Sequence, residues 1–262
     1  MATNNVLNAA DFTFAPFVAD VGGDSGALRL ATSKNDPQIQ YVIKSGYPDI
    51  ACNEFMYHHV AATLGLYTQE ARLFKGVAAG KYAVGIRYVP NARKFIYEEA
   101  DEDNRRVFCE FKALYVVLNE ADSEEFFYDA QTKVFKLDNA ESFNLGILQV
   151  NSAIKYGNDK EMPPQIFEMM LSGLNNIEYG KYSILLKLLH KYYGKTAVEA
   201  AFGLMERFTT FDLSKIEPAC GTLEEIYPYI ITEYYLEFIR RRITACKQFV
   251  SEHNIAQFTG KY

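Results

Sequence analysis

The stretch YVIKSGYPDIACNEF, residues 41–55, puts a lysine and a glutamate ten residues apart on two different predicted elements. The apolar run 41–43 predicts a buried strand that ends on Lys44, because β-branched and aromatic residues favour strands. Glu54 stands near the start of the helical pattern that follows. Two interpretations are open. The two residues form an ion pair that directs the lysine into a cleft, or they are a solvated strand end and a glutamate favoured by the helix dipole.

The first ninety residues predict a small sheet with one inserted helix. Their strand-like segments are separated by Gly, Asp, Asn and Pro. Met56, Val60 and Leu64 recur with the spacing of one helix face, with Asn53 as the predicted N-cap and Gly65 as the predicted stop. We therefore expect the lysine-bearing strand to lead into a single helix.

The rest of the chain predicts mostly helices. A helical pattern over 104–119 is followed by a hairpin formed by FFYD and KVFKLD, and helical patterns dominate from about residue 164. We expect an α+β, two-lobed architecture. A sheet-rich N-lobe would span 1–89 and a larger, mostly helical C-lobe 90–262, with the segment 88–92 as the crossing.

Composition limits the classes of function. The chain has 262 residues, of which 49% are hydrophobic, and a net charge of −6, so a packed core is expected and direct nucleic-acid binding is not. No apolar run has the length of a membrane span, and the N-terminus lacks the pattern of a signal peptide, which predicts a cytoplasmic protein. The four cysteines are far apart, without a CxxC pair, so neither a zinc site nor redox chemistry is expected.

A glycine-rich segment, VGGDSGALRL (21–30), precedes the lysine strand. Backbone N–H groups at Gly22, Gly23 and Gly26 are candidates for phosphate contact, because glycine lets the backbone approach a ligand closely. The segment does not match GxGxxG or the Walker pattern, and a plain hairpin turn is the alternative.

Two aspartates are candidates for phosphoryl-transfer chemistry. Asp138 ends the strand KVFKLD, where a carboxylate can bind Mg²⁺ that bridges the phosphates of ATP, and an ordinary Asp-Asn turn is the alternative. Asp122 lies in LNEADSEEFF (118–127), a stretch rich in acidic residues, and is the candidate base that orients the attacking hydroxyl. A solvated acidic loop is the alternative there.

The order of these features resembles that of the HipA-type bacterial serine/threonine kinases, which are related in fold to protein kinases and to phosphatidylinositol kinases. The resemblance covers about residues 20–145, and its best match is NEFMYHHVAATLGLYTQEARLF (53–74). Further matches are YVIK (41–44), IRYVPNARKF (86–95) and KLDNAESF (136–143). The family's usual N-terminal extension has no counterpart, so we expect a compact kinase core.

The resemblance implies roles for individual residues. Lys44 would contact the ATP phosphates, Glu54 would hold Lys44 in an ion pair, and Asp138 would bind the metal. The backbone near Tyr88 and Val89 would contact adenine.

In toxin members a serine of the glycine-rich loop is autophosphorylated, and Ser25 occupies a comparable place.

The resemblance also shows where this chain departs from the family. The catalytic pattern D-x-H-x-x-N, set on Asp122, puts Glu124 at the histidine and Phe127 at the asparagine. Phenylalanine cannot bind magnesium, so either Asn119 or Glu124 replaces the second ligand or the second ion is lost.

Three functions follow as expectations. The first is an ATP- and Mg²⁺-dependent kinase that phosphorylates a serine or threonine of an unknown protein. The second is a pseudokinase of the same fold that binds a nucleotide or a partner. The third is a kinase of small molecules or lipids, because fold does not fix function. A small antitoxin-like partner protein is implied by the family resemblance alone.

Overall fold

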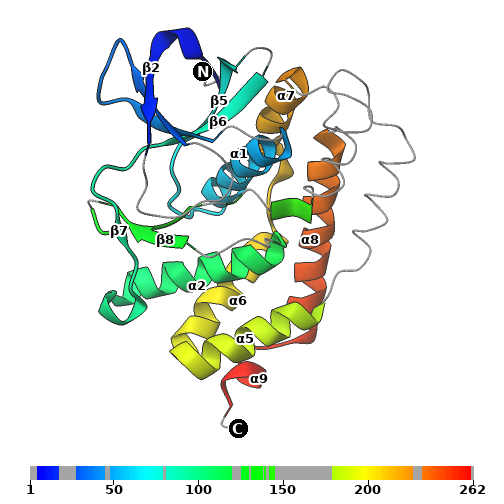
Figure 1. Ribbon diagram of the computed structural model, residues 1–262. Coiled ribbons are helices and arrows are strands. Elements are labelled where there is room, and N and C mark those ends of the chain that lie inside the picture. Colours follow the sequence, from blue (N-terminus) through cyan, green and yellow to red (C-terminus); the bar gives the residue numbers. More distant parts are fainter. Residues whose placement is uncertain are drawn as a thin grey trace.

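The structure is a computed structural model that describes residues 5–17, 28–44, 48–78, 81–119, 125–129, 131–137, 139, 142–144, 179–226 and 232–260. A curved sheet and one helix form one end of the molecule, and a group of helices forms the other (Figure 1). The expected α+β architecture, with a sheet-rich N-terminal lobe and a mostly helical C-terminal lobe, is confirmed.

Six strands form the main sheet in the order β1-β5-β6-β4-β3-β2. They are β1 (Val6–Asn8), β2 (Phe12–Pro16), β3 (Arg29–Ser33), β4 (Gln40–Lys44), β5 (Ala71–Ala78) and β6 (Lys81–Arg87). β1 runs parallel to β5, and the other neighbours are antiparallel. Side chains alternate between the two faces of a sheet. Tyr41 and Ile43 of β4 accordingly pack with Phe12 and Phe74 in a small core on one face.

The other face of this sheet is covered by helix α1 (Pro48–Thr63). Leu73 and Val84 of β5 and β6 belong to the same core cluster as residues of α1. Most side chains of α1 from position 51 onward are buried, because the helix contacts β5 and β6 as well as the C-terminal part of the chain. The sequence predicts one buried face for this helix, whereas in the structure its side chains are buried on nearly all sides.

The predicted end of α1 is confirmed and its predicted start is wrong. The helix ends at Thr63, and Gly65 has a φ of 79°, the left-handed conformation that glycine adopts easily after a helix. Asn53 is not the N-cap, because the helix begins at Pro48, where a proline costs no hydrogen bond. Asn53 is instead a buried residue inside the helix.

A second, smaller sheet follows the segment 88–92. It contains β7 (Arg93–Lys94), β8 (Glu125–Tyr128) and β9 (Val134–Leu137) in that order, with antiparallel pairing. The predicted hairpin corresponds to β8 and β9. Helix α2 (Glu102–Val117), which begins with Asp101 as its N-cap, lies between β7 and β8 in the sequence.

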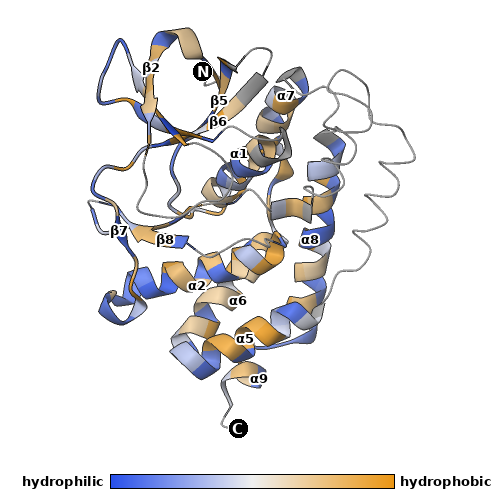
Figure 2. Cartoon of the chain, in the orientation of Figure 1, coloured by the Kyte–Doolittle hydropathy of each residue, from blue (hydrophilic) through white to orange (hydrophobic). Residues whose placement is uncertain are grey.

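Helices make up the described C-terminal part. They are α5 (Tyr179–Tyr193), α6 (Lys195–Thr209), α7 (Glu217–Ile226), α8 (Thr232–Glu252) and α9 (Ala256–Thr259). Single 3-10 turns are spread along the described chain: η1 (Ala9–Asp11), η2 (Tyr97–Glu99), η3 (Ser142–Asn144) and η4 (Leu213–Lys215). The helical character predicted from about residue 164 onward is confirmed from Tyr179 on, where the structure describes the chain again. Residues 164–178 lie outside the described residues. Hydrophobic and hydrophilic residues share the surfaces of α2 and α5, as in amphipathic helices (Figure 2).

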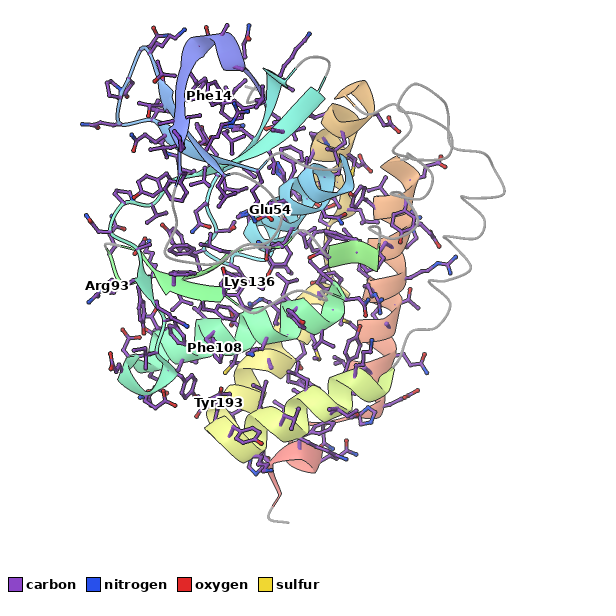
Figure 3. The ribbon with its side chains drawn as sticks, viewed as in Figure 1. Phe14, Glu54, Arg93, Phe108, Lys136 and Tyr193 are labelled. Atoms are coloured by element: carbon purple, nitrogen blue, oxygen red, sulfur yellow. The ribbon has the colours of Figure 1, made fainter. Side chains whose placement is uncertain are left out.

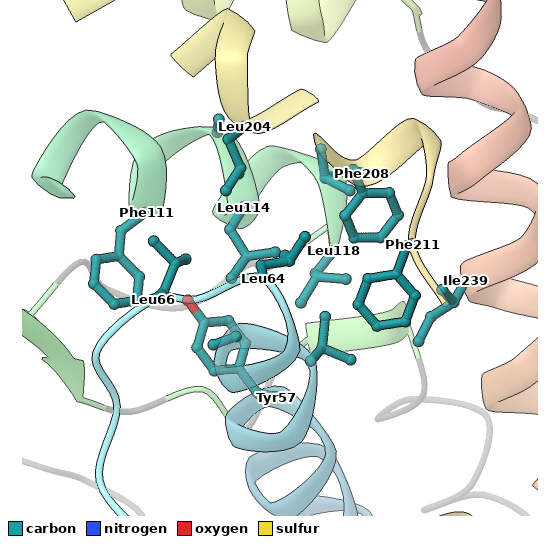
Figure 4. Packing of buried hydrophobic residues seen from close by; sticks show 14 of the residues in the cluster. Tyr57, Leu64, Leu66, Phe111, Leu114, Leu118, Leu204, Phe208, Phe211 and Ile239 are labelled. Carbon is teal, nitrogen blue, oxygen red and sulfur yellow. The ribbon is translucent and has the colours of Figure 1, made fainter. Parts of the chain in front are cut away.

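One continuous hydrophobic core joins α1 to the C-terminal helices. Leu114 of α2 and Leu118, directly after α2, lie between Tyr57 of α1 and Phe208 of α6 (Figure 4). Leu64, directly after α1, packs in the same place. α2 packs mainly on α6, and α8 also contacts α6. This core fixes α1, and with it Glu54, against the C-terminal part of the chain.

In the described part of the chain, no helix combines the length and the apolar character that crossing a membrane requires. The four cysteines are free thiols and all are buried.

Candidate functional site

Lys44 and Glu54 form an ion pair. Lys44 is the last residue of β4, opposite Val84 of β6, and its Nζ lies 2.9 Å from Glu54 Oε2. The lysine side chain is 17% exposed and the glutamate side chain 1%. Glu54 lies in the second turn of a helix whose first turn begins at Pro48, so the interpretation of a solvated glutamate at a helix N-terminus is excluded.

Glu54 is a buried acceptor with several donors. Besides Lys44, the backbone N–H of Asn139 donates to Oε2 at 2.9 Å and the Asn139 side-chain Nδ2 donates to Oε1 at 3.2 Å. Burial alone would raise the pKa of the Glu54 carboxyl, but the Lys44 charge, His58 and the Asn139 N–H together hold that pKa well below its usual range. Glu54 is therefore ionised, and its charge is matched inside the protein.

His58 is the fourth residue of this group, and sequence analysis did not find it. It lies one helical turn after Glu54, and its Nε2 is 3.4 Å from Glu54 Oε1. Because a carboxylate can only accept, His58 Nε2 carries the hydrogen in this contact. His58 Nδ1 is hydrogen bonded to the Thr68 hydroxyl in the segment between α1 and β5. The i, i+4 spacing of Glu54 and His58 was a signal for this contact.

Lys136 and Asn139 extend the group toward the second sheet. Lys136 Nζ donates to Asn139 Oδ1 at 2.9 Å, and both residues are buried. The ammonium also lies 5.6 Å from the ring centre of Tyr57 and 5.9 Å from that of Tyr115, between α1 and α2 (Figure 3). Lys44, Glu54, Asn139 and Lys136 thus form a continuous chain of polar contacts, with three charged groups and one amide.

Several predicted site residues lie outside the described residues: Gly22, Gly23, Ser25, Gly26, Asp122, Glu124 and Asp138. Their immediate surroundings are described. The glycine-rich segment joins β2 to β3, whose last pairs are Pro16 with Arg29 and Phe17 with Leu28. Leu137 ends β9 directly before Asp138, and Asn139 directly after it is held by Glu54.

Tyr88 and Val89 follow β6 directly, at the crossing to the second sheet. The Tyr88 N–H donates to the Gln40 carbonyl at 2.9 Å, within the main sheet. The Tyr88 ring contacts Phe17, four residues before the glycine-rich segment, with ring centres 5.5 Å apart. Because the Tyr88 amide is used inside the sheet, the predicted adenine contacts would come from the Tyr88 carbonyl and from Val89.

Comparison with solved structures identifies the fold. The chain matches the crystal structure of a Helicobacter pylori proinflammatory kinase, CtkA, with a TM-score of 0.55 over 89% of this chain and 94% of that chain. The protein has a protein-kinase-like fold. The sequence identity is 14%, so the match concerns the fold alone. Scans against protein-family models and against curated proteins found no match.

In this kinase-like fold, the strand lysine and the helix glutamate come from the two elements that the sequence predicted. The narrower resemblance to HipA-type kinases stays a prediction, as do the roles of the individual residues. The structure brings Lys44 and Glu54 together, and it brings both close to Asn139, the neighbour of the predicted metal ligand Asp138.

Asn119 and Phe127 bear on the predicted second metal ligand. Asn119 has a φ of 51° after the end of α2, and its Oδ1 accepts a hydrogen bond from Lys181 Nζ at 3.2 Å. Phe127 is buried in β8 and stacks on Phe135, with ring centres 6.1 Å apart. Among the described residues, no group of three or more His, Cys, Asp or Glu side chains could hold a metal ion.

Proposed function

We propose that this protein binds ATP with Mg²⁺ and transfers the γ-phosphate to a serine or threonine of another protein. The observation that carries the proposal is the ion pair between Lys44 and the buried Glu54, in a chain with a kinase-like fold. In kinases of this type an equivalent lysine neutralises phosphate oxygens and a helix glutamate holds it.

The surroundings of Glu54 support this role for Lys44. A lysine side chain has many rotamers, and an ion pair with a buried carboxylate restricts them. Glu54 is itself fixed by three further contacts, from the Asn139 N–H, the Asn139 side chain and His58. The ammonium of Lys44, which keeps some exposure, is then positioned in advance for an anionic ligand. Such positioning supplies much of the catalysis in phosphoryl transfer.

The same contacts restrain the segment that contains Asp138. Glu54 binds both the main chain and the side chain of Asn139, so the next residue along the chain from Asp138 is fixed to α1. We propose that Asp138 binds Mg²⁺, because carboxylate oxygens are the ligands that this ion prefers. When bound, Mg²⁺ would neutralise charge on the phosphates. Asp122 would accept the proton of the attacking hydroxyl as the phosphate moves to it and ADP leaves.

A second candidate is a pseudokinase, which binds the nucleotide or a partner without transferring phosphate. Phe127 favours the pseudokinase. It stands at the position of the asparagine that binds the second metal ion in the family, it cannot bind a metal, and it lies buried against Phe135. Asn119, a predicted substitute, is hydrogen bonded to Lys181. The kinase and a nucleotide-binding pseudokinase share the ATP site and differ only in the transfer step, whereas a partner-binding pseudokinase needs no nucleotide.

Thermal melting with ATP and Mg²⁺ tests the shared part of both candidates. A ligand that binds only the folded state stabilises it by about 2.7 kcal/mol at a hundredfold excess over its dissociation constant. We expect a Mg²⁺-dependent rise in Tm for the wild type that is lost in Lys44→Met and Asp138→Ala. The matched control is Lys75→Met, an exposed lysine on β5, which should keep the rise.

Radiolabelled ATP then separates the two candidates. Transfer of label to a protein acceptor or to the protein itself, lost in Asp122→Asn, supports the kinase. Binding without transfer supports the pseudokinase. No change in Tm at millimolar ATP, for a wild type that melts cooperatively, overturns the kinase and leaves a partner-binding pseudokinase as the better account.

A further inference from the structure

An apolar stripe lies exposed along α5. Ile184, Leu188 and Tyr192 recur every four residues and are 58%, 46% and 65% exposed, so they point to the same side of the helix. In the described part of the chain, the only other large hydrophobic side chain that is exposed to this degree is Ile96, at 44%. Apolar side chains gathered in this way on a surface mark an interaction site more often than single ones do.

The α5 stripe is flanked by positive charge. Lys181, Lys187 and Lys191 are exposed on α5, and residues 179–193 contain no aspartate or glutamate. The chain as a whole has a net charge of −6, so this helix departs from the average of the molecule. The surface therefore fits a partner that is apolar and acidic.

A segment of the same chain has these properties. Residues 96–103, IYEEADED, contain five acidic residues, no basic one, and the exposed Ile96. We name this stretch the acidic segment. Its acidic side chains are all exposed, at Glu98, Glu99, Asp101, Glu102 and Asp103.

The two surfaces are neighbours in the fold. Tyr97, in the acidic segment, contacts Tyr193 at the end of α5, with ring centres 4.1 Å apart. Figure 2 shows the hydrophilic start of α2 and the α5 helix, with both hydrophobic and hydrophilic residues, in the lower part of the molecule, and Figure 3 labels Tyr193 at the end of α5. The C-terminal end of the α5 stripe therefore adjoins the acidic segment, with basic residues on the α5 side of the contact and acidic residues on the other.

A surface of this kind is complementary to itself after a twofold rotation. A rotation axis near the contact of Tyr97 with Tyr193 brings the acidic segment of each copy onto the α5 stripe of the other. We propose that the occupant of this surface is a second copy of the chain, in a closed twofold dimer. In this dimer, Ile96 packs on the stripe residues of the other copy, and the carboxylates of the acidic segment face its Lys187 and Lys191.

Charge reversal tests the proposal, with the molar mass measured by light scattering and sedimentation. The wild type should show twice the monomer mass of 29.8 kDa at about 100 µM protein and about 0.05 M salt, and should dissociate toward about 0.5 M salt, because exposed charges are then screened. Lys187→Glu with Lys191→Glu, and separately Glu98→Lys with Glu99→Lys, should each weaken the dimer at least about tenfold. All four residues are exposed, and circular dichroism checks that the variants fold.

An equimolar mixture of the two double variants gives the sharpest outcome. In the mixed pair, the reversed charges at positions 187 and 191 of one variant face the reversed charges at positions 98 and 99 of the other, so these positions again carry opposite charges. The unchanged Lys187 and Lys191 face the unchanged Glu98 and Glu99. We expect the mixture to form the dimer that neither variant forms alone. Three results overturn the proposal: a wild type that stays monomeric, a dimer unaffected by both reversals, or reversed variants that fail to pair in the mixture. Binding of the monomer to anionic vesicles or to an acidic peptide instead would assign the surface to those partners.

Discussion

At the scale of single residues, the buried charge of Glu54 makes stability depend on pH. The pKa of Glu54 in the folded protein lies below its ordinary value of about 4.3. The folded state then binds the proton more weakly than the unfolded state. The contribution of the ionised carboxylate to stability is therefore present above the ordinary pKa and is lost as the pH falls below it.

The substitution Glu54→Gln removes this contribution. At neutral pH it should lower the free energy of unfolding by about 3 kcal/mol, because one partner of a buried ion pair is lost. The difference between wild type and variant should shrink as the pH falls from about 6 to about 3. Urea unfolding at several pH values measures both curves. A difference that stays constant over this range would contradict an ionised Glu54 in the fold.

Lys136 and Asn139 form the other residue-scale contact that can be tested. Asn139→Ala removes the side-chain acceptor of a buried ammonium, and Lys136→Met removes the ammonium itself. Each change should cost about 2–4 kcal/mol in the free energy of unfolding. The double variant should cost at least about 1 kcal/mol less than the sum, because the two residues interact directly. Additive costs in this double-mutant cycle would show that the hydrogen bond contributes little.

At the scale of elements, the main sheet requires a glycine at position 85 of β6. A Cβ there would lie 2.3 Å from Phe74 Cε2 and 3.0 Å from Ile43 Cδ1. Phe74 is fully buried and packs on the rings of Phe12 and Tyr41, so it has little room to move. Gly85→Ala should therefore destabilise the protein by about 1–3 kcal/mol.

Gly203 in α6 is the matched control for this substitution. A Cβ at Gly203 meets nothing within 4 Å. Gly203→Ala should stabilise the protein by up to about 1 kcal/mol, because alanine has the higher helix propensity. Adding Phe74→Leu to Gly85→Ala should recover part of the loss if crowding is the cause. Chemical denaturation measures all three variants, and equal effects at the two glycines would contradict the crowding argument.

At the scale of the whole molecule, α8 connects helix α1 of the N-terminal lobe to the C-terminal lobe. The hydroxyl of Tyr235 donates to Asn53 Oδ1 of α1 at 2.9 Å, and that of Tyr234 donates to the Phe143 carbonyl at 2.9 Å. Phe143, with a φ of 68°, also donates its N–H to the Leu118 carbonyl at the end of α2. Helices from both lobes thus share buried contacts, so we expect them to unfold in one transition.

Tyr235→Phe tests this connection. The change removes a buried hydrogen bond with almost no change in volume, and should lower the free energy of unfolding by about 1–2 kcal/mol. Tyr192→Phe, at a side chain that is 65% exposed, should leave it unchanged. Denaturation followed by tyrosine fluorescence and by circular dichroism should give the same midpoint for Tyr235→Phe. Separate midpoints for the two probes would show that the lobes unfold independently.

The sequence by itself determined most of the strands, most of the helices and the two-lobed α+β class. These features follow from hydrophobic periodicity and from turn residues, which act over a few residues. The sequence also limited Lys44 and Glu54 to two alternatives, but it could not choose between them. The choice depends on where helix α1 packs, and a local pattern does not contain that information. The wrong N-cap at Asn53 has the same origin, because its buried polar side chain bonds to Tyr235, 182 positions away.

Only the tertiary structure decided what holds Glu54. Asn139 lies 85 positions further along the chain and reaches Glu54 because the core joins α1 to the second sheet. Lys136 is a charged residue on a strand, and such residues are usually exposed. It is buried here because Asn139 and two tyrosine rings surround its ammonium group. Burial strengthens each of these polar contacts and makes an unpaired charge costly, so the group forms only when packing brings all its members together.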